Sequence, residues 1–417
     1  MIVREIDADT FNDFANSHVL KNFFQTKQYG ELMSHSDFSV MYVGGYLNDT
    51  LVAGSLILYK TIGPSMKYGY APRGFLLDYY DNEILTSFTK KIKEFFLKRA
   101  FAFIKINPEI TYSKIDFTTQ SKIVNSKNSN LINQLKSLGY DKLRDNLYFE
   151  SLLPKYTPVI YLPTYDFNDL DQDLRNEIET AQLSGLSLVT GTINDLETFY
   201  KFVEYKDTKT IAYYKLFYEA FNKDDMADLL FVELNYDTYG KYLQKQYIIQ
   251  TEKNEQINMA FNENPDDMEL YNKKMKSDQE LAKIASKIAE SNIKVQENHT
   301  KEILGAAFVV KHQGRITILI SGQNKDFDFC DTKTFMYYKI IEEYKKKSYL
   351  FLDLNGITAD YSDTNPYKEL NAFKLKFKPN VFEYIGEFDL IVNKPFHQLL
   401  WSTNQIQKEF YKPPVKK

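Results

Sequence analysis

The sequence predicts an α+β protein built from two related domains, because the same order of elements occurs twice along its 417 residues. Each copy starts with two apolar runs joined by a short turn, at Asn48-Asp49 in residues 40–60 and at Gln313-Gly314 in residues 304–321. A helix, a short apolar strand, a second helix and a closing strand follow each hairpin. Sheets of this kind carry helices on their faces, so we expect two sheets, each with its own core.

The elements of the two copies can be matched in order. In the first copy, the helix, strand, second helix and closing strand are expected at residues 82–99, at 103–107, up to Leu138 and at 147–152. In the second copy, the same four elements are expected at residues 332–347, at 349–354, up to about Phe373 and at 383–392. The repeat therefore covers most of both halves of the chain.

A segment of different character separates the two copies. Residues 239–262 and 268–299 are rich in Lys, Glu, Gln and Asn, with apolar residues mostly three or four positions apart. Pro265 ends the first helical stretch, and Asp266 or Asp267 suits the start of the second. The pattern predicts an antiparallel coiled-coil hairpin that projects as an arm. Its charges are about balanced, which favours a rigid prop or a subunit contact over RNA recognition.

These patterns predict four regions in the chain. They are a first domain at residues 1–153, a second domain at 154–238 and 301–396, the arm at 239–300, inserted in the second domain, and a C-terminal helix and tail at 397–417.

Composition excludes several classes of protein. The formal net charge of −4 argues against a general nucleic-acid coat protein, and a single cysteine, Cys330, excludes an intramolecular disulfide. The five histidines show no metal-ligand spacing, so we expect no metal site. The N-terminus lacks the apolar region of a signal peptide, and no apolar run approaches the roughly 20 residues that span a bilayer. We therefore expect a cytoplasmic protein.

Short motifs along the whole chain resemble those of one enzyme family. They are residues 22–30 (NFFQTKQYG), 70–74 (YAPRG) followed by Asp78-Tyr79, 104–108 (IKINP), and 383–389 (EYIGEFD), of which the last is the most specific. On these motifs the chain is similar to the Fem-type (FemA/FemB/FemX-like) aminoacyltransferases, which build the interpeptide bridge of bacterial peptidoglycan. The resemblance implies two acetyltransferase-like (GNAT-type) domains with a helical arm inserted in the second.

The resemblance also implies the reaction and its partners. An amino acid of the Gly, Ala or Ser class would pass from aminoacyl-tRNA to the stem-peptide lysine of a UDP-linked or lipid-linked muropentapeptide. The amine would attack the ester directly, without a protein nucleophile, metal or organic cofactor, so that positioning supplies the rate. Peripheral contact with the inner membrane leaflet, and a homodimer or a related Fem-like partner, are further expectations.

Two cationic side chains are the leading site residues. Lys374, in the Phe373-Lys374 motif that the family places near the reacting carbonyl, is the expected catalytic residue, as a stabiliser of oxyanion charge. The alternation of Lys374, Lys376 and Lys378 is also typical of an exposed strand face. Arg73, in a loop between Pro72 and Gly74, would bind the precursor's diphosphate, although an Arg that covers a strand end is an equal alternative.

Further substrate-binding residues follow from the resemblance. Gln25, Tyr29, Tyr70 and Phe373 would line the cleft, and Lys209 stands where the family has an arginine. The chain departs from the family pattern at Met33, Lys209 and Ile320, which puts the acceptor in doubt more than the fold. Two other functions stay open. A non-catalytic scaffold would tolerate Ala at Arg73 and Lys374, and an acyl-CoA-dependent transferase would need a pyrophosphate loop, whereas Pro64 removes a donor from the loop at residues 59–64.

Overall fold

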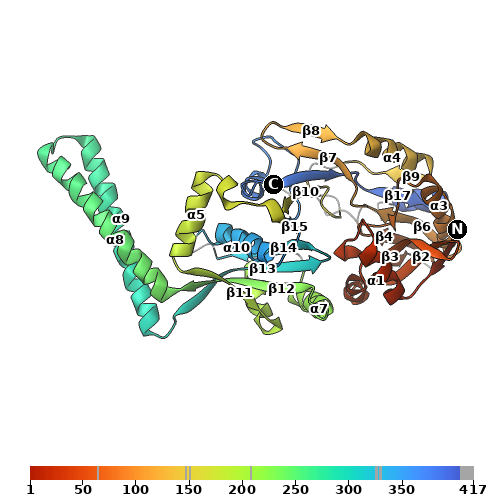
Figure 1. The fold of residues 1–417 in the computed structure, drawn as a ribbon, viewed down its shortest axis with the longest axis horizontal. Coiled ribbons are helices and arrows are strands. Elements are labelled where there is room, and N and C mark those ends of the chain that lie inside the picture. The colour runs from red at the N-terminus through yellow and green to blue at the C-terminus, as the bar shows by residue number, and fades with distance from the viewer. Residues whose placement is uncertain are drawn as a thin grey trace.

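The two predicted hairpins are present, and each lies in a sheet of its own (Figure 1). In the computed structural model, which describes residues 1–62, 65–145, 148–149, 152–206, 209–324, 327 and 331–403, β2 (Ser39–Leu47) pairs with β3 (Thr50–Ile62), and β13 (Lys301–His312) pairs with β14 (Arg315–Gln323). Asn48, Asp49, Gln313 and Gly314 all have positive φ, from 45° to 80°. Two-residue turns of this hand match the twist of the paired strands.

The first sheet has the strand order β1-β2-β3-β4-β6-β17-β9, with β5 paired to β3. Its remaining strands are β1 (Ile2–Glu5), β4 (Met66–Ala71), β5 (Leu76–Leu77), β6 (Phe101–Ile106), β9 (Tyr140–Lys142) and β17 (Phe388–Ile391). The helices of this half are α1 (Ala8–Ser17), α2 (Lys27–Ser34), α3 (Asn82–Leu97), α4 (Ser126–Ser137) and α12 (Lys394–Ser402), with a short 3₁₀ turn at Phe23–Gln25. Buried residues of α3, among them Phe88, Ile92 and Phe96, join the sheet in one core.

The second sheet has the order β11-β12-β13-β14-β15-β10-β16-β7-β8. Its remaining strands are β7 (Thr111–Asp116), β8 (Ser121–Val124), β10 (Tyr156–Tyr161), β11 (Leu186–Gly191), β12 (Ala227–Asn235), β15 (Phe351–Asp353) and β16 (Asn380–Tyr384). The helices of this half are α5 (Gln172–Leu183), α6 (Leu196–Val203), α7 (Ile211–Asn222), α10 (Thr332–Lys346) and α11 (Lys368–Leu375), with 3₁₀ turns at Leu162–Thr164, Phe167–Asp169 and Ile193–Asp195.

The two halves exchange strands, which the repeat did not predict. The hairpin of β7 and β8, from the first half, pairs with β16 in the second sheet, and β17, from the second half, lies between β6 and β9 in the first. The bounds predicted for the two domains remain a prediction. β7, β8 and β17 each pair in the sheet of the other half. A shared cluster of aromatic residues, including Phe23 and Phe221 with ring centroids 6.1 Å apart, also joins the halves.

Both predicted closing strands are corrected by the structure. The strand expected at residues 383–392 is divided into β16 and β17, because Gly386 adopts a φ of 95° between them and the chain changes sheet there. The strand expected at residues 147–152 is wrong at the positions described, 148–149 and 152, which lie outside any strand, and β9 is the last strand before them. The other predicted elements are present within a few residues.

The arm consists of α8 (Tyr236–Glu263) and α9 (Met268–Gln296), which pack along each other and extend from the body (Figure 1). Leu243 and Ile284 are buried near its base, as an apolar heptad predicts. Towards the tip the prediction is wrong, because Met268, Tyr271 and Met275 are exposed. Polar contacts hold the helices there instead. They include the Asn254 amide, which donates to Ser277 Oγ at 3.0 Å and to Asp278 Oδ1 at 2.7 Å.

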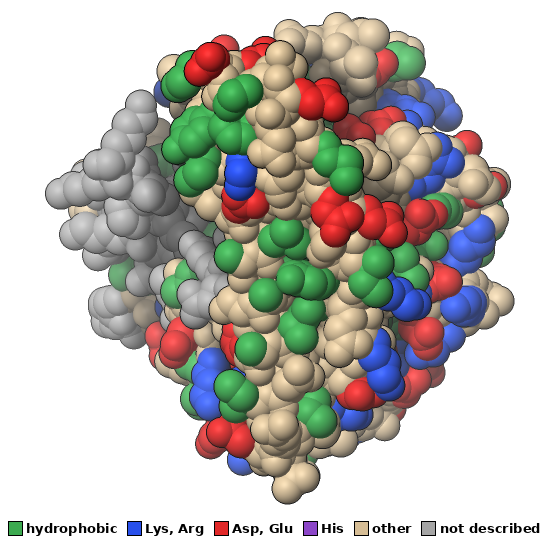
Figure 2. All heavy atoms as spheres, turned by 90° about the vertical axis from the view of Figure 1, so that its left-hand side faces the viewer, with side chains coloured by type: hydrophobic (Ala, Val, Ile, Leu, Met, Phe, Trp, Pro, Cys, Tyr) green, Lys and Arg blue, Asp and Glu red, His purple; other side chains and the backbone are tan. Residues whose placement is uncertain are grey.

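The surface of the molecule on the arm's side carries no single sign of charge. Figure 2 shows Lys and Arg side chains interspersed with Asp and Glu around hydrophobic side chains on that face. The 14 residues after Thr403 and Cys330 lie outside the described part of the chain, so the predictions made for them stay predictions.

Candidate active site

A buried charged cluster lies where strands of both sheets end. Glu109 follows β6, Arg315 begins β14, Asp353 ends β15 and Tyr384 ends β16. The Arg315 guanidinium forms ion pairs with the carboxylates of Glu109 and Asp353, the latter at 2.6 Å, and the Tyr384 hydroxyl donates to Glu109 Oε1 at 2.8 Å. The cluster therefore links a loop of the first sheet to three strands of the second.

Arg315 and Glu109 hold each other in their charged forms. Burial opposes the charge of Arg315, but Glu109 and Asp353 outweigh it and raise the pKa of the guanidinium. Burial also opposes the charge of Glu109, but Arg315 and then Arg73 hold its pKa below the ordinary value. Removing one member of such a group would leave a buried charge without a partner.

Arg73 projects from a tight turn directly after β4. Its backbone has a φ of 54°, and its N–H donates to Asn107 Oδ1 at 2.8 Å. The guanidinium donates to the Pro154 carbonyl at 2.9 Å and lies 4.9 Å from the centre of the Tyr384 ring. Asn107 Nδ2 also donates to the Tyr70 hydroxyl at 3.0 Å. Of the predicted residues, the structure thus brings Tyr70 and Arg73 together.

Gln25 holds the Arg73 turn in place through hydrogen bonds from its buried side chain. Its side chain is fully buried, and Nε2 donates to the Pro72 carbonyl at 2.7 Å and to the Leu56 carbonyl at 3.3 Å. Its Oε1 accepts from the Leu56 N–H at 2.9 Å and from Ser55 Oγ at 3.2 Å. All of its polar atoms are used within the protein, so its contribution is to hold the backbone of the turn.

Lys374 is buried on a helix. The alternative of an exposed strand face is wrong, because α11 continues to Leu375 and only 6% of Lys374 is exposed. Nζ donates to the Gly356 carbonyl at 2.7 Å. Burial lowers the pKa of Lys374 to about 7, with Lys333 adding to the effect and Asp353 opposing it. The amine is therefore divided between its charged and neutral forms near neutral pH.

A second perturbed amine lies beside the predicted motif. Lys333, on α10, has its Nζ 3.8 Å from the centre of the Phe373 ring. Burial, together with the charges of Lys206 and Lys376, lowers its pKa to about 8. Phe373 in turn packs edge-on against Tyr337 at 4.9 Å. Cationic side chains thus surround Phe373 and Lys374, which suits an anion or a carbonyl that gains negative charge.

The Arg73 turn and Lys374 lie on two sides of one contact. Arg73 donates to Pro154, and Lys374 donates to Gly356. A side chain on Gly356 would have its Cβ only 2.5 Å from Pro154 Cβ, so Gly356 lies directly against the Pro154 ring. Asp353 completes the connection, since it is paired with Arg315 and acts on Lys374 electrostatically. Residues from motifs 300 positions apart therefore form one candidate centre.

The remaining predicted residues lie on α2, on β14 and just before α7. Tyr29 is buried, and the departures Met33 and Ile320 pack against the same hydrophobic cluster. Lys209 is exposed, with Nζ 4.7 Å from the centre of the Tyr213 ring. At Met33 the structure thus places an apolar contact where the family resemblance implies a lysine.

Sequence reasoning missed Glu109, Arg315 and Lys333 as site residues. The composition gives a signal for Arg315, since the chain has only six arginines against 46 lysines and each arginine is therefore unusual. Lys333 has no such signal, because lysine is common throughout the chain. Within the described residues, no group of three or more His, Cys, Asp or Glu side chains is placed to hold a metal ion, and no helix is both long and apolar enough to cross a bilayer.

The fold and the buried cationic site are those of a group-transferring enzyme, and the comparisons with known proteins give its class. The model of the FemAB family matches residues 6–403. The chain therefore belongs to the FemAB family and is an aminoacyltransferase.

Named relatives and a solved structure cover nearly the whole chain. It is 21% identical over 416 residues to the aminoacyltransferase FemA of Staphylococcus epidermidis (97% of this chain, 99% of that one). It is also 21% identical over 432 residues to the lipid II:glycine glycyltransferase of Staphylococcus aureus (97% and 95%). The crystal structure of FemX superposes with a TM-score of 0.75 at 19% identity, covering 96% of this chain and all of that one. This likeness confirms the predicted fold class.

Proposed function

We propose that the chain transfers an amino acid of the Gly, Ala or Ser class from aminoacyl-tRNA to the stem-peptide lysine amine of a peptidoglycan precursor. Its membership of an aminoacyltransferase family supports the transfer itself. The observation that carries the proposal is the buried Lys374 amine, in contact with Gly356 opposite the Arg73 turn.

The reaction needs little from the protein besides position and charge. The acceptor amine forms a bond to the ester carbonyl carbon, and the bond from that carbon to the tRNA ribose oxygen breaks. The ribose hydroxyl takes up the proton that the amine loses, so the atoms balance without a co-reactant. In its protonated form, Lys374 would donate a hydrogen bond to the carbonyl oxygen as negative charge develops there, an interaction that acts mainly in the transition state.

A lipid-linked acceptor is the preferred form of the precursor. The name of the Staphylococcus aureus relative refers to lipid II, a lipid-linked precursor, and this relative aligns with 97% of the chain. The enzyme would then work at the inner face of the membrane, with Arg73 available to a phosphate of the precursor. A UDP-linked acceptor is the alternative, and the changed positions Met33, Lys209 and Ile320 bear on this choice.

The test is transfer of label from radioactive aminoacyl-tRNA to lipid-linked and UDP-linked muropentapeptide, with RNase-treated tRNA as the blank. We expect RNase-sensitive label on the lipid-linked acceptor. Lys374→Met should abolish most of the transfer, whereas Lys368→Met should not, because Lys368 lies on the same helix but is exposed and pairs only with Asp363 among described residues. No transfer to either acceptor by folded protein would favour the scaffold.

A further inference from the structure

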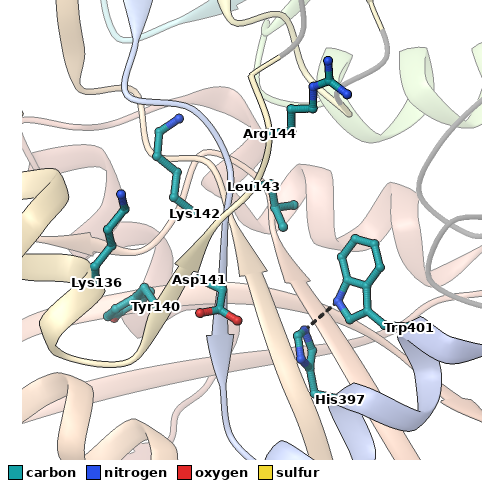
Figure 3. Close-up of a pocket in the computed structure, with 8 residues that line it drawn as sticks. All are labelled: Lys136, Tyr140, Asp141, Lys142, Leu143, Arg144, His397 and Trp401. Carbon is teal, nitrogen blue, oxygen red and sulfur yellow. Dashed lines mark hydrogen bonds between the residues drawn. The ribbon is translucent and has the colours of Figure 1, made fainter.

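A second hollow, apart from Lys374, is lined by the end of α4, by β9 and the residues after it, and by α12 (Figure 3). Its volume is about 490 Å³. This is within the range of small-molecule sites, roughly 300–1,000 Å³, and far larger than a single phosphate or sulfate needs. Neither the family motifs nor the proposed reaction uses its side chains.

The hollow has an excess of positive charge. Lys136, Lys142 and Arg144 line it with one carboxylate, Asp141. Lys142 is paired with Asp145 at 2.7 Å. Lys136 and Arg144 are exposed, and their side chains form no hydrogen bond or ion pair with any residue that the structure describes. Two unpaired cations at the edge of a concave surface favour an anionic ligand, and a guanidinium is well suited to phosphate.

The opposite wall is a rigid aromatic surface. Figure 3 shows Trp401 and His397 across the hollow from Lys136 and Lys142, with the Asp141 carboxylate between them. The Trp401 indole donates to His397 Nε2 at 2.9 Å. His397 itself lies 3.3 Å from Asp389 Oδ2 and is nearly buried. The indole is thereby held in one orientation, as a face on which a planar ring can stack.

We propose that this hollow binds a ribonucleotide. Its phosphate would lie on Arg144 and Lys136, its base against Trp401, and a ribose hydroxyl would donate to Asp141. A plain anion site would not need the aromatic wall, and an aromatic pocket alone would not need the unpaired cations. The ligand is a free nucleotide or the exposed 3′ end of an RNA, which share this chemistry.

The position of the hollow connects it to the candidate centre. Arg144 also lines a small cavity of about 20 Å³ whose other lining residues include Arg73, Asn107 and Tyr384. A ligand on Arg144 would therefore lie one side chain away from the Arg73 turn. If the ligand is an RNA end, the inference rests on the proposed function, and the hollow is a subsite for the aminoacyl-tRNA substrate. If it is a free nucleotide, the inference stands independently.

The only tryptophan of the chain lines the hollow, which makes the test direct. The full-length protein is titrated with UMP, AMP and the trinucleotide CCA while Trp401 emission is followed, and calorimetry gives affinities independently. We expect saturable quenching. Arg144→Gln and Lys136→Gln should each weaken binding about tenfold, the loss of one charge-assisted contact. Lys98→Gln, an exposed lysine that lines a different hollow, should bind as the wild type does.

The outcomes separate the two sources and decide the proposal. Binding of CCA at least tenfold tighter than that of either mononucleotide identifies an RNA end, and equal binding identifies a free nucleotide. The proposal is overturned if no ligand quenches Trp401 at millimolar concentration, or if quenching is the same in the Arg144 and Lys136 variants as in the wild type. Since no transfer is measured, this result does not depend on the proposed reaction.

Discussion

Asn in place of Asp389 would leave the Lys105 ammonium without its counter-charge in the interior. The two side chains have no exposed surface, and Lys105 Nζ lies 2.7 Å from Asp389 Oδ1. Breaking a buried pair by removing one partner costs about 3–5 kcal/mol. Asn can still accept one hydrogen bond from Lys105, so we expect Asp389→Asn to lower the free energy of unfolding of this region by about 3 kcal/mol. Adding Lys105→Met should restore at least half of that loss, because neither position of the pair then carries a buried charge.

The pH dependence of this loss follows from the pKa of Asp389. Burial would raise that pKa, but the Lys105 charge and the hydrogen bonds to the carboxylate outweigh it and hold the pKa below the ordinary value. A lowered pKa stabilises the fold at pH above the unfolded value, about 3.9, and the contribution disappears as the pH falls through the folded value. The difference between wild type and Asp389→Asn should therefore be complete at pH 7 and should shrink below about pH 4.

Urea denaturation followed by Trp401 emission measures this region, since Trp401 contacts His397, which contacts Asp389. The reasoning is refuted if Asp389→Asn costs less than about 1 kcal/mol at pH 7. It is also refuted if the double variant is no more stable than the single one.

Three further predictions concern the centre and the packing of the halves. Lys374→Met should lower kcat by roughly 100-fold or more. The kcat of the wild type should fall as the pH rises through about 7, where Lys374 loses its proton. A pH profile of Lys374→Arg should lack this fall, because Arg stays charged. Gly322→Ala should destabilise the fold by more than about 2 kcal/mol, since its Cβ would lie 1.8 Å from the Phe202 carbonyl oxygen; a thermal-shift comparison with Gly240→Ala, whose nearest contact is 3.1 Å, checks this. Arg315→Gln should cost about 3 kcal/mol or more in urea, and an unchanged midpoint would contradict the charged cluster.

Local chemistry determines the elements that the sequence predicts well. Asn48-Asp49 and Gln313-Gly314 tolerate positive φ, so both hairpins can be recognised from a few residues. The exchange of β7, β8 and β17 has no such signal, because the choice of sheet depends on which edges are free after both halves have packed. The alternation of Lys374, Lys376 and Lys378 could not show that Lys374 is buried for the same reason, since its burial depends on residues that are distant in sequence.

The roles of the predicted site residues remain predictions, but their positions can be compared with the structure. Motif resemblance indicated Arg73 and Lys374, and the structure places them on either side of the Pro154–Gly356 contact. It could not indicate Glu109 or Arg315, whose importance lies in a pair formed across 206 positions. Nor could it show that the side-chain amide of Gln25 is already hydrogen-bonded to the backbone around the Arg73 turn.

The strand exchange also determines when the first half can be completed during synthesis. Lys105 on β6 pairs with Asp389 on β17, 284 positions later in the chain. At roughly 5–20 residues per second, a ribosome needs about 15 to 60 s to make the intervening residues. Throughout that interval β6 has a free edge, and the carboxylate of Asp389 is not yet there to pair with Lys105. The amino-terminal half is thus made first but finished last. Every chain that stops before β17 would expose the unpaired edge of β6.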